Sequence, residues 1–309
     1  MSRGKIVITP RPFNTKGMYF IDLLESRGYE VDYNSLNRRF LHEELLDKIE
    51  DADAIITGND LLNEEILKES KQLKVISKYG VGLDNIDVKY ANKMGIKVCK
   101  ALGANSRSVA EMTILMMLSA SRDFVNISNQ AKNGNEERVI GQELYGKTLG
   151  ILGLGAIGKK VAKIALSFEM KVIAYDPYVM QSDSELIELV SQNRLIQESD
   201  YISLHIPLTE NTAGIINKSV FDRMKESAIL INSARAGLVE NKALYQALTE
   251  GKIRYVIEDV ELKERDKAII DLPNYSITPH AASFTVESDN NTMKIAVDNV
   301  LKVLEGGSI

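Results

Sequence analysis

The segment KTLGILGLGAIGKKVAKIAL, residues 147–166, carries the strongest structural signal in this chain. An apolar run typical of a strand leads into the array G-x-G-x-x-G, and the residues after the array have the spacing of a helix. The three glycines of the array are Gly153, Gly155 and Gly158. In this setting glycine permits a tight turn, a close approach of the backbone to a pyrophosphate, and close packing of the helix on the strand. The segment therefore predicts a β-α-β unit that binds a dinucleotide.

An acidic residue supports this interpretation, because Asp176 ends the next apolar run, KVIAYD (171–176). A carboxylate there can accept hydrogen bonds from both ribose hydroxyls, and its charge would repel a 2′-phosphate. The start of the helix, with Ala156 and Ile157, offers unpaired N–H groups and the positive end of the helix dipole to the phosphates. The glycine array alone arises often by chance, but its combination with a strand, a helix and this acid is specific. We expect NAD rather than NADP.

Short apolar runs alternate with helical patterns along the whole chain, and continuous runs of this kind are typical of buried parallel strands. Longer helical patterns cover residues 106–131 and 286–304. Because 309 residues exceed the size at which one core grows comfortably, we expect two α/β domains with parallel sheets. The runs are KIVIT (5–9), ADAIIT (52–57), LKVIS (73–77), IKVC (96–99), KTLGIL (147–152), KVIAYD (171–176), DYISLHI (200–206), AILIN (228–232) and IRYVIED (253–259).

The overall composition narrows the class of protein. A net charge of -5 and the lack of any run of Lys or Arg argue against nucleic acid as a partner. Cys99 is the only cysteine, so the chain can form neither an internal disulfide nor a cysteine zinc site, and we expect no metal. The apolar segment MTILMMLSA (112–120) is too short to cross a bilayer, and the first residues do not resemble a secretory signal. We expect a cytoplasmic protein that does not bind membranes.

Three further segments each lie at the end of an expected strand of the second half: LINSARAG (230–237), VIEDVELKE (256–264) and SITPHAAS (276–283). The residues of interest in them are Arg235, Glu264 and His280. Because the carboxyl ends of parallel strands meet at the edge where α/β sheets bind ligands, we expect the three side chains to lie close together.

These residue types suit the reduction of a 2-keto acid. The planar guanidinium of Arg235 matches a carboxylate, and the imidazole of His280 can donate a proton to a carbonyl oxygen as hydride arrives. A carboxylate beside the imidazole, for which Glu264 is the candidate, would favour the protonated ring. Each residue alone is more often a surface or turn residue, so the hypothesis rests on the combination. His42 lies on an expected polar helix surface, which leaves His205 as the other possible base.

Six motifs in order resemble those of the D-isomer-specific 2-hydroxyacid dehydrogenase family, and together they extend over essentially the whole chain. The motifs are YGVGLDNID (79–87), GANSRSVAE (103–111), GKTLGILGLGAIGKKVA (146–162), SLHIPLTENT (203–212), INSARAGLV (231–239) and TPHAAS (278–283).

The resemblance implies a Rossmann-type NAD-binding domain, residues 102–283, inserted into a flavodoxin-like substrate-binding domain made of residues 1–101 and 284–309. It implies the same catalytic set, Arg235, Glu264 and His280, and a homodimer built on the nucleotide domain. The substrate would further contact Lys78, Tyr79, Gly80 and Val81. The cofactor would further contact His205, Pro207, Thr212, Ser233, Ala234 and Asp259.

The chain departs from the family pattern in the loop that follows the expected strand 253–259. Arg265 stands where the family commonly has proline after the catalytic glutamate, and Glu258 stands where an apolar residue is usual. These two departures leave the geometry of the loop open. Ala236 replaces a frequent glycine, a change between small residues that we expect to have little effect.

Among the activities of the family, the pattern most resembles that of the enzymes that oxidise 3-phosphoglycerate at the entry to serine biosynthesis. Lys78 and Arg11 could receive a phosphate, although Thr57 stands where we would expect another cation. Another D-2-hydroxy acid, as in glyoxylate or hydroxypyruvate reductases, is an alternative. A protein that senses NAD without catalysis is a second alternative, which the presence of all three catalytic residues disfavours.

Overall fold

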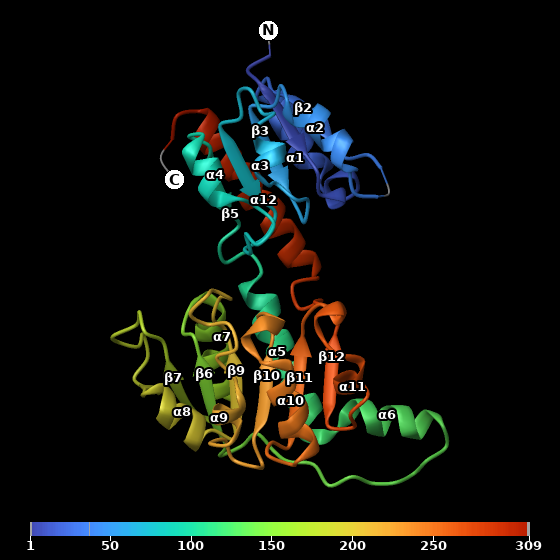
Figure 1. Ribbon diagram of the computed structural model, residues 1–309, viewed down its shortest axis with the longest axis vertical. Coiled ribbons are helices and arrows are strands. Elements are labelled where there is room, and N and C mark those ends of the chain that lie inside the picture. Colours follow the sequence, from blue (N-terminus) through green and yellow to red (C-terminus); the bar gives the residue numbers. More distant parts are fainter. Residues whose placement is uncertain (1, 37, 308–309) are drawn as a thin grey trace. The chain divides into compact units, whose positions relative to one another are not determined.

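The computed structural model describes residues 2–36 and 38–307, and the chain separates into two compact units. Unit 1 comprises Met1–Asn105 and Phe284–Ile309, and unit 2 comprises Ser106–Ser283. The domain boundary expected after residue 101 lies just before the structural boundary after Asn105. Each unit contains one parallel sheet, so the α/β class with two parallel-sheet domains is confirmed (Figure 1).

The sheet of unit 1 has five parallel strands in the order β2-β1-β3-β4-β5. Four of the strands coincide with the expected apolar runs. The edge strand β2 was not expected, because its sequence EVDY is only partly buried and has no apolar run. The strands are β1 (Lys5–Ile8), β2 (Glu30–Tyr33), β3 (Ala54–Thr57), β4 (Val75–Lys78) and β5 (Lys97–Lys100).

Helices cover both faces of this sheet. The last helix of the chain, α12 (Val286–Leu304), packs on β3, β4 and β5 together with α1 (Met18–Ser26), and its buried side chains include Met293 and Val297. The opposite face carries α2 (His42–Ile49), α3 (Glu64–Leu67) and α4 (Val88–Lys93), and the short helix η1 (Arg11–Asn14) follows β1. The chain therefore returns to unit 1 after unit 2 is complete.

The sheet of unit 2 has seven parallel strands in the order β12-β11-β10-β9-β6-β7-β8. The chain runs from β6 outward to β8 and then crosses to the other side of β6, so the strand order reverses between β6 and β9. The strands are β6 (Thr148–Leu152), β7 (Lys171–Tyr175), β8 (Ile187–Leu189), β9 (Tyr201–Leu204), β10 (Ile229–Asn232), β11 (Tyr255–Asp259) and β12 (Tyr275–Thr278).

Two hydrophobic clusters fill the two faces of this sheet. One face carries α5 (Ser106–Arg122) and α7 (Ala156–Ser167). The other face carries α8 (Gln192–Glu198), α9 (Lys218–Phe221), α10 (Asn241–Thr249) and α11 (Lys267–Ile270). Two single turns, η2 (Ala236–Leu238) and η3 (Leu262–Glu264), follow β10 and β11.

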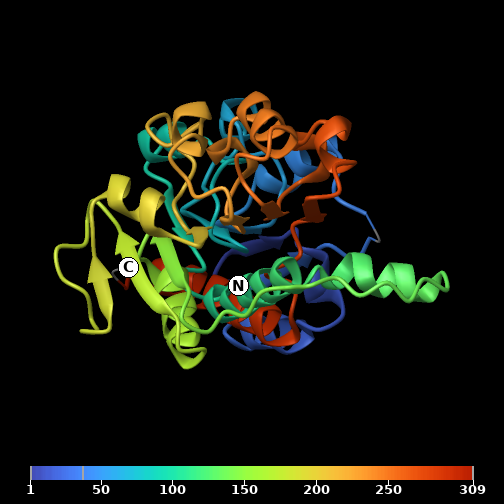
Figure 2. The same cartoon turned by 90° about the horizontal axis from the view of Figure 1, so that it is seen from below.

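The single helix expected over residues 106–131 is divided in the structure. Asp123 has a φ of +51°, which ends α5 and sets α6 (Phe124–Lys132) in a new direction. None of the residues of α6 is buried. Figures 1 and 2 show α6 and the segment after it projecting from the rest of unit 2.

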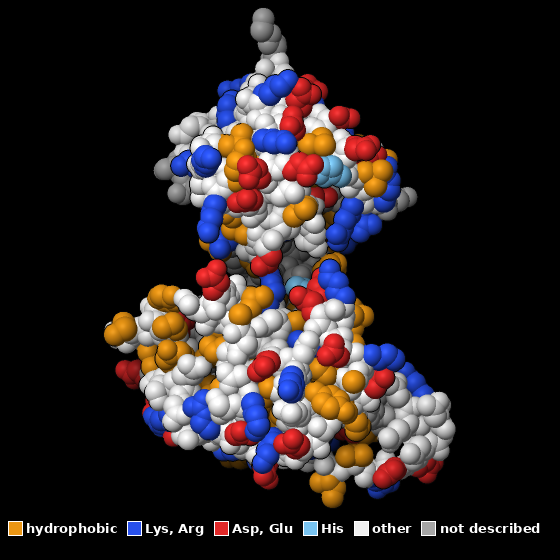
Figure 3. All heavy atoms as spheres, viewed as in Figure 1, with side chains coloured by type: hydrophobic (Ala, Val, Ile, Leu, Met, Phe, Trp, Pro, Cys, Tyr) orange, Lys and Arg blue, Asp and Glu red, His pale blue; other side chains and the backbone are white. Residues whose placement is uncertain are grey.

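The surface mixes both signs of charge. On the face drawn in Figure 3, Lys and Arg side chains are interspersed with Asp and Glu side chains in each unit. Within the described residues, no helix combines the length and the apolar character that crossing a membrane requires.

Candidate functional site

The glycine loop joins β6 to α7 at the edge where the strands of unit 2 end. Gly153 has a φ of +100°, and a Cβ there would lie 2.6 Å from the backbone oxygen of His205. A Cβ on Gly158 would lie 2.1 Å from the backbone oxygen of Gly153, so a side chain would push α7 away from the loop. A Cβ on Gly155 would meet no atom of the described residues within 4 Å. Internal packing thus requires the first and third glycines, and the second faces space that a ligand can approach.

Asp176 follows β7 and ties the glycine loop to the turn after this strand. Its Oδ2 accepts a hydrogen bond from the backbone N–H of Leu154 at 2.9 Å, and its Oδ1 accepts one from that of Tyr178 at 2.9 Å. A carboxylate has roughly four lone-pair sites, so acceptor capacity is left for further donors. The side chain is partly exposed, as recognition of a ribose requires.

The residues around this loop fit a dinucleotide. The loop lies after β6 and beside β9, where the strand order reverses, and ligands of open α/β sheets bind at such a point. The first N–H groups of α7 have no acceptor within the helix, so those of Ala156 and Ile157 can hold a pyrophosphate. Asp176 can accept the hydroxyls of a ribose.

The buried side chain of Asn232, at the end of β10, fixes the backbone that carries Arg235. Its Nδ2 donates to the backbone oxygen of Arg235 at 2.9 Å, and its Oδ1 accepts from the N–H of Ala234 at 3.1 Å. The hydroxyl of Ser233 shares a hydrogen bond of 3.1 Å with that of Thr113 on α5. The partly exposed guanidinium of Arg235 donates to the backbone oxygen of Ala234 at 2.8 Å. We did not expect a role for Asn232, although it belongs to the motif INSARAGLV.

Asp259, at the end of β11, organises the turn that carries His280. Its buried carboxylate accepts the hydroxyl of Thr278 at 2.6 Å and the N–H groups of Ala281 and Ala282 at 2.7 and 2.8 Å. Within this turn His280 has a φ of +53°, which residues other than glycine rarely adopt. The carboxylate thus stabilises an unusual backbone conformation, and the imidazole stays partly exposed.

The structure does not show the expected contact between Glu264 and His280. Glu264 is exposed at the end of η3, and its carboxylate forms no hydrogen bond or ion pair with any other described residue. The carboxylate that reaches His280 belongs to Glu261, with 4.0 Å between Oε1 and Nδ1. Glu261 directly precedes η3, and its backbone oxygen accepts a hydrogen bond from the N–H of Glu264 at 2.9 Å. The catalytic role of Glu264 stays a prediction.

The substrate residues expected in unit 1 are Lys78, which ends β4, and the loop that follows it. Lys78 is buried, and its Nζ donates to Asn85 Oδ1 at 2.6 Å and to the backbone oxygen of Gly58. The hydroxyl of Tyr79 donates to Asp289 on α12, and Gly80 has a φ of +140°. Val81 completes this loop.

The end of the neighbouring strand β3 has no cation at the position where one was expected for a phosphate. Thr57 pairs with Lys78 across the sheet, and its hydroxyl donates to the carboxylate of Asp60 at 3.3 Å. Arg11 lies in η1 after β1 and is exposed. The same edge of the sheet therefore carries both signs of charge. Among the described residues, no group of three or more His, Cys, Asp or Glu side chains could hold a metal ion.

Comparison with known proteins assigns this architecture to a family. Residues 114–282, more than half of the chain, match the model described as D-isomer specific 2-hydroxyacid dehydrogenase, NAD binding domain. The chain belongs to the D-isomer-specific 2-hydroxyacid dehydrogenase family. The resemblance to this family is thereby confirmed, and so is NAD as the cofactor that the glycine loop predicted.

Three relatives illustrate the similarity. D-3-phosphoglycerate dehydrogenase of Methanocaldococcus jannaschii is 43% identical over 272 residues, which are 85% of this chain and 52% of that protein. Hydroxypyruvate reductase of Thermotoga maritima is 38% identical over 290 residues, 91% of this chain and 93% of that protein. The NAD+-bound 3-phosphoglycerate dehydrogenase of Entamoeba histolytica has a TM-score of 0.82 at 29% identity, covering 99% of this chain and 97% of that one. The chain thus spans about half the length of the first relative.

The loop after β9 carries the other cofactor residues that the family resemblance implied. The N–H of His205 donates to the backbone oxygen of Leu152 at 2.8 Å, and its Nε2 shares a hydrogen bond of 2.8 Å with the hydroxyl of Ser203. The hydroxyl of Thr212 donates to the backbone oxygen of Pro207 at 2.7 Å. Although some surface of His205 stays accessible, desolvation by the surrounding protein lowers the pKa of the ring to about 4. A neutral ring at pH 7 does not suit a proton donor, which favours His280 for that role.

We predict that His205 stays neutral when the pH falls from about 8 to about 5, because burial disfavours its charged form. Since the unfolded state would take up this proton first, the residue should destabilise the fold as the pH drops from about 6.5 toward 4. Titration of the imidazole C–H signals by NMR tests this, with the denaturant-unfolded protein as the reference and a His205→Asn variant to assign the signal. A midpoint of His205 in the folded protein close to the ordinary histidine value of 6.5 would contradict the prediction.

Proposed function

We propose that the protein is an NAD-dependent dehydrogenase that interconverts D-2-hydroxy acids and 2-keto acids. One observation carries the proposal: a single edge of the sheet of unit 2 bears the glycine loop after β6, Arg235 after β10 and His280 after β12. A dinucleotide, a carboxylate clamp and a proton donor are the parts that such a reaction needs.

When bound, NADH supplies the hydride. Arg235 would bind the substrate carboxylate through its planar fork, and His280 would give a proton to the carbonyl oxygen, so that hydride and proton together yield the hydroxyl group. Glu264 is the carboxylate proposed to favour the imidazolium, and Glu261 is within ion-pair distance of the ring. Asp259 and Asn232 hold the backbones on which these side chains depend.

For the substrate we propose 3-phosphoglycerate and its keto form, as in serine biosynthesis. The buried Lys78 at the end of β4 supports a charged substrate, and so does the similarity to phosphoglycerate dehydrogenases. An unphosphorylated acid such as hydroxypyruvate or glyoxylate is the second candidate. The carboxylate of Asp60 beside Thr57 favours it, because a phosphate prefers several cationic donors. The similarity to a hydroxypyruvate reductase over nearly its whole length also favours it.

Turnover of NADH with a panel of keto acids tests the proposal. Phosphohydroxypyruvate, hydroxypyruvate, glyoxylate and pyruvate are offered to the purified protein, and we expect oxidation of NADH with at least one of them. His280→Ala should lower kcat by roughly 10²–10⁴-fold. Arg235→Ala should lower kcat/KM by at least about tenfold, since each hydrogen bond to a charged group contributes roughly 1.5–3 kcal/mol. Both variants should keep their affinity for NADH.

The matched control is His42→Ala, which removes an exposed histidine that pairs with Glu65 at 3.4 Å on the surface of unit 1. It should keep the kinetic constants of the wild type. Binding of NADH without turnover of any keto acid in the panel would instead support a protein that senses NAD.

Asp176 is proposed to exclude NADP, because its carboxylate would face a 2′-phosphate. Asp176→Asn keeps an acceptor oxygen for Leu154 and removes the charge, so the ratio of kcat/KM for NADH over NADPH should fall by about tenfold, or about 1.4 kcal/mol. Asp222→Asn, which affects a carboxylate paired with Lys218 on α9, is the control and should leave the ratio unchanged. An unchanged ratio in Asp176→Asn would refute this role.

We also propose a homodimer built on unit 2. α6 buries none of its residues, and exposed apolar side chains lie on it and on the segment after it, including Phe124, Val125, Val139 and Ile140. Exposed apolar groups of this kind mark interaction sites, and a helix as short as α6 is marginal in water without a partner.

Sedimentation velocity should show a dimer at micromolar concentration. The variant Phe124→Asp with Ile140→Asp should shift the protein toward monomer, because it places charges in a buried contact. Leu41→Asp, at an exposed apolar position of unit 1, is the control and should stay dimeric. A monomeric wild type would end this proposal.

A further inference from the structure

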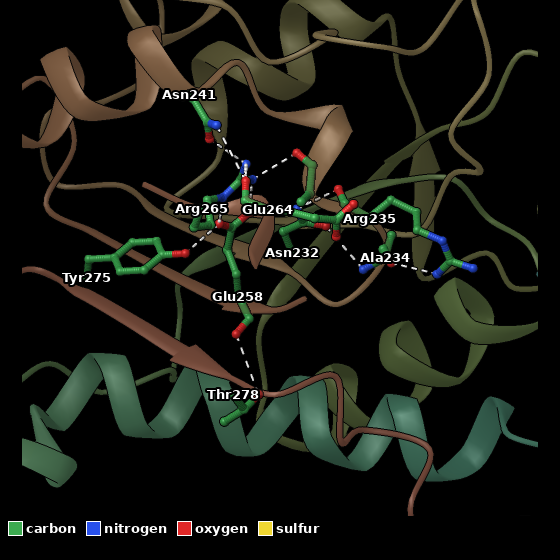
Figure 4. A network of polar contacts seen from close by, with 10 residues as sticks. Asn232, Ala234, Arg235, Asn241, Glu258, Glu264, Arg265, Tyr275 and Thr278 are labelled. Carbon is green, nitrogen blue, oxygen red and sulfur yellow. Dashed lines mark hydrogen bonds and ion pairs between the residues drawn. The ribbon is translucent and has the colours of Figure 1, made fainter. Parts of the chain in front are cut away.

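The two residues that depart from the family pattern, Glu258 and Arg265, contact each other inside unit 2 (Figure 4). Arg265 Nε donates to Glu258 Oε2 at 2.5 Å, and Arg265 Nη2 donates to Glu258 Oε1 at 2.8 Å. Both side chains are buried, with 0% of Glu258 and 6% of Arg265 exposed. The departures are therefore one feature, a buried bidentate ion pair that joins the end of β11 to the residue after η3.

Every polar atom of this pair has a partner. Besides its two bonds to Glu258, the guanidinium of Arg265 donates to the backbone oxygen of Ala236 at 2.8 Å, to Asn241 Oδ1 at 2.7 Å and, more weakly, to the backbone oxygen of Glu264 at 3.4 Å. These contacts use all five donors of an arginine.

The carboxylate of Glu258 is satisfied in the same way. Its Oε1 accepts from Asn232 Nδ2 at 2.7 Å as well as from Arg265, and its Oε2 accepts from the hydroxyl of Tyr275 at 2.7 Å as well as from Arg265. Burial and the Glu258 carboxylate raise the pKa of Tyr275, so its hydroxyl stays a donor. Burial would lower the pKa of Arg265, but Glu258 more than offsets it, and the net shift is upward. A buried network in which every member is satisfied is rigid.

The network ends on the two loops that carry the proposed catalytic residues. Asn232 bonds the N–H of Ala234 and the backbone oxygen of Arg235, and Arg265 bonds the backbone oxygen of Ala236, so the chain is held on both sides of the Arg235 side chain. On the other loop, Arg265 directly follows Glu264, the last residue of η3. One ion pair thus fixes both loops relative to the same strand.

The backbone conformation at Arg265 explains why proline, the usual residue of the family at this position, would not fit here. Arg265 has a φ of -122°, whereas the ring of proline holds φ near about -65°. The loop after Glu264 therefore follows a different course from one that begins with proline. Its rigidity comes from the ion pair instead of from a fixed dihedral angle.

We propose that Glu258 and Arg265 are positioning residues, which hold Arg235 and the acidic turn η3 in the arrangement that the reaction needs. This inference rests on the proposed dehydrogenase function. Neither side chain meets the reacting atoms in this role. They act through the backbones at 234–236 and 262–265, where a shift of about 1 Å at a catalytic group can cost roughly a hundredfold in rate.

The decisive experiment separates stability from catalysis. Arg265→Met leaves the Glu258 carboxylate buried without its partner, so both the Tm and the turnover of keto acid should fall. The double variant Glu258→Leu with Arg265→Met removes both charges, and burial of two apolar side chains should restore most of the Tm. Its kcat/KM should nevertheless stay roughly 10- to 100-fold below that of the wild type, because the contacts to Ala236 and Asn232 are lost. The affinity for NADH should change little in either variant.

Lys225→Met is the matched control. It removes another partly buried ion pair of unit 2, in which Lys225 Nζ lies 2.8 Å from Asp200 Oδ1, just before β9 at the opposite edge of the sheet. It should lower the Tm and leave kcat/KM unchanged. If the double variant regains both the Tm and the kcat/KM of the wild type, the pair only stabilises the fold and the proposal is wrong.

If the variants with Met or Leu do not fold, Arg265→Lys provides a milder test. It keeps the positive charge but loses the planar guanidinium that forms two parallel hydrogen bonds. Hydrogen exchange at residues 232–241 and 261–265 should therefore become faster than in the wild type and in Lys225→Met. Unchanged exchange in both segments would overturn the proposal. This measurement also distinguishes failure of the proposed dehydrogenase function from failure of the positioning role. If the wild type turns over no keto acid, the proposed dehydrogenase function is wrong. The exchange rates would still test whether the ion pair holds the two loops.

Discussion

The parallel register of the sheet in unit 2 is the constraint on which the rest of the site depends. All of its strands point the same way, so the loops that leave β6, β9, β10, β11 and β12 emerge at one edge. Because the strand order reverses between β6 and β9, the loops that leave these two neighbouring strands run in opposite directions. The glycine loop is the one that leaves β6. Residues far apart in the sequence, from Gly153 to His280, can serve one ligand only because this edge collects them.

The sequence predicted the parts of the fold that are most buried. Interior strands such as β6 and β9 are continuous apolar runs and were expected, whereas the edge strands β2 and β8 have exposed positions and were not. The break between α5 and α6 was also missed, because the left-handed conformation of Asp123 has no sequence signal comparable to a glycine or a proline. Hydrophobic burial is encoded locally, and bends imposed by tertiary contacts are not.

The same difference between local and tertiary signals decides which residues of the candidate site could be predicted. The glycine array and Asp176 were predictable because one local conformation requires them. The approach of Glu261 rather than Glu264 to His280 depends on how η3 is oriented, and no spacing rule specifies that. Glu258 and Arg265 were noticed as two separate departures. Their pairing could not be predicted, because it requires the end of β11 and the residue after η3 to face each other in the folded chain.

The buried ion pair also limits how such a protein can have evolved. Loss of the charge at Glu258 or Arg265 alone leaves the opposite charge buried without its partner, at a cost of about 3–5 kcal/mol, which is a large part of the free energy of unfolding of many domains, about 5–15 kcal/mol. The usual family arrangement has an apolar residue at position 258 and proline at position 265. A lineage that changes from one arrangement to the other must therefore pass through a poorly folded intermediate, or first acquire stabilising substitutions at other positions. The two positions are expected to be inherited as a unit, and swapping either one singly between homologues should fail where swapping both, together with the loop between them, succeeds.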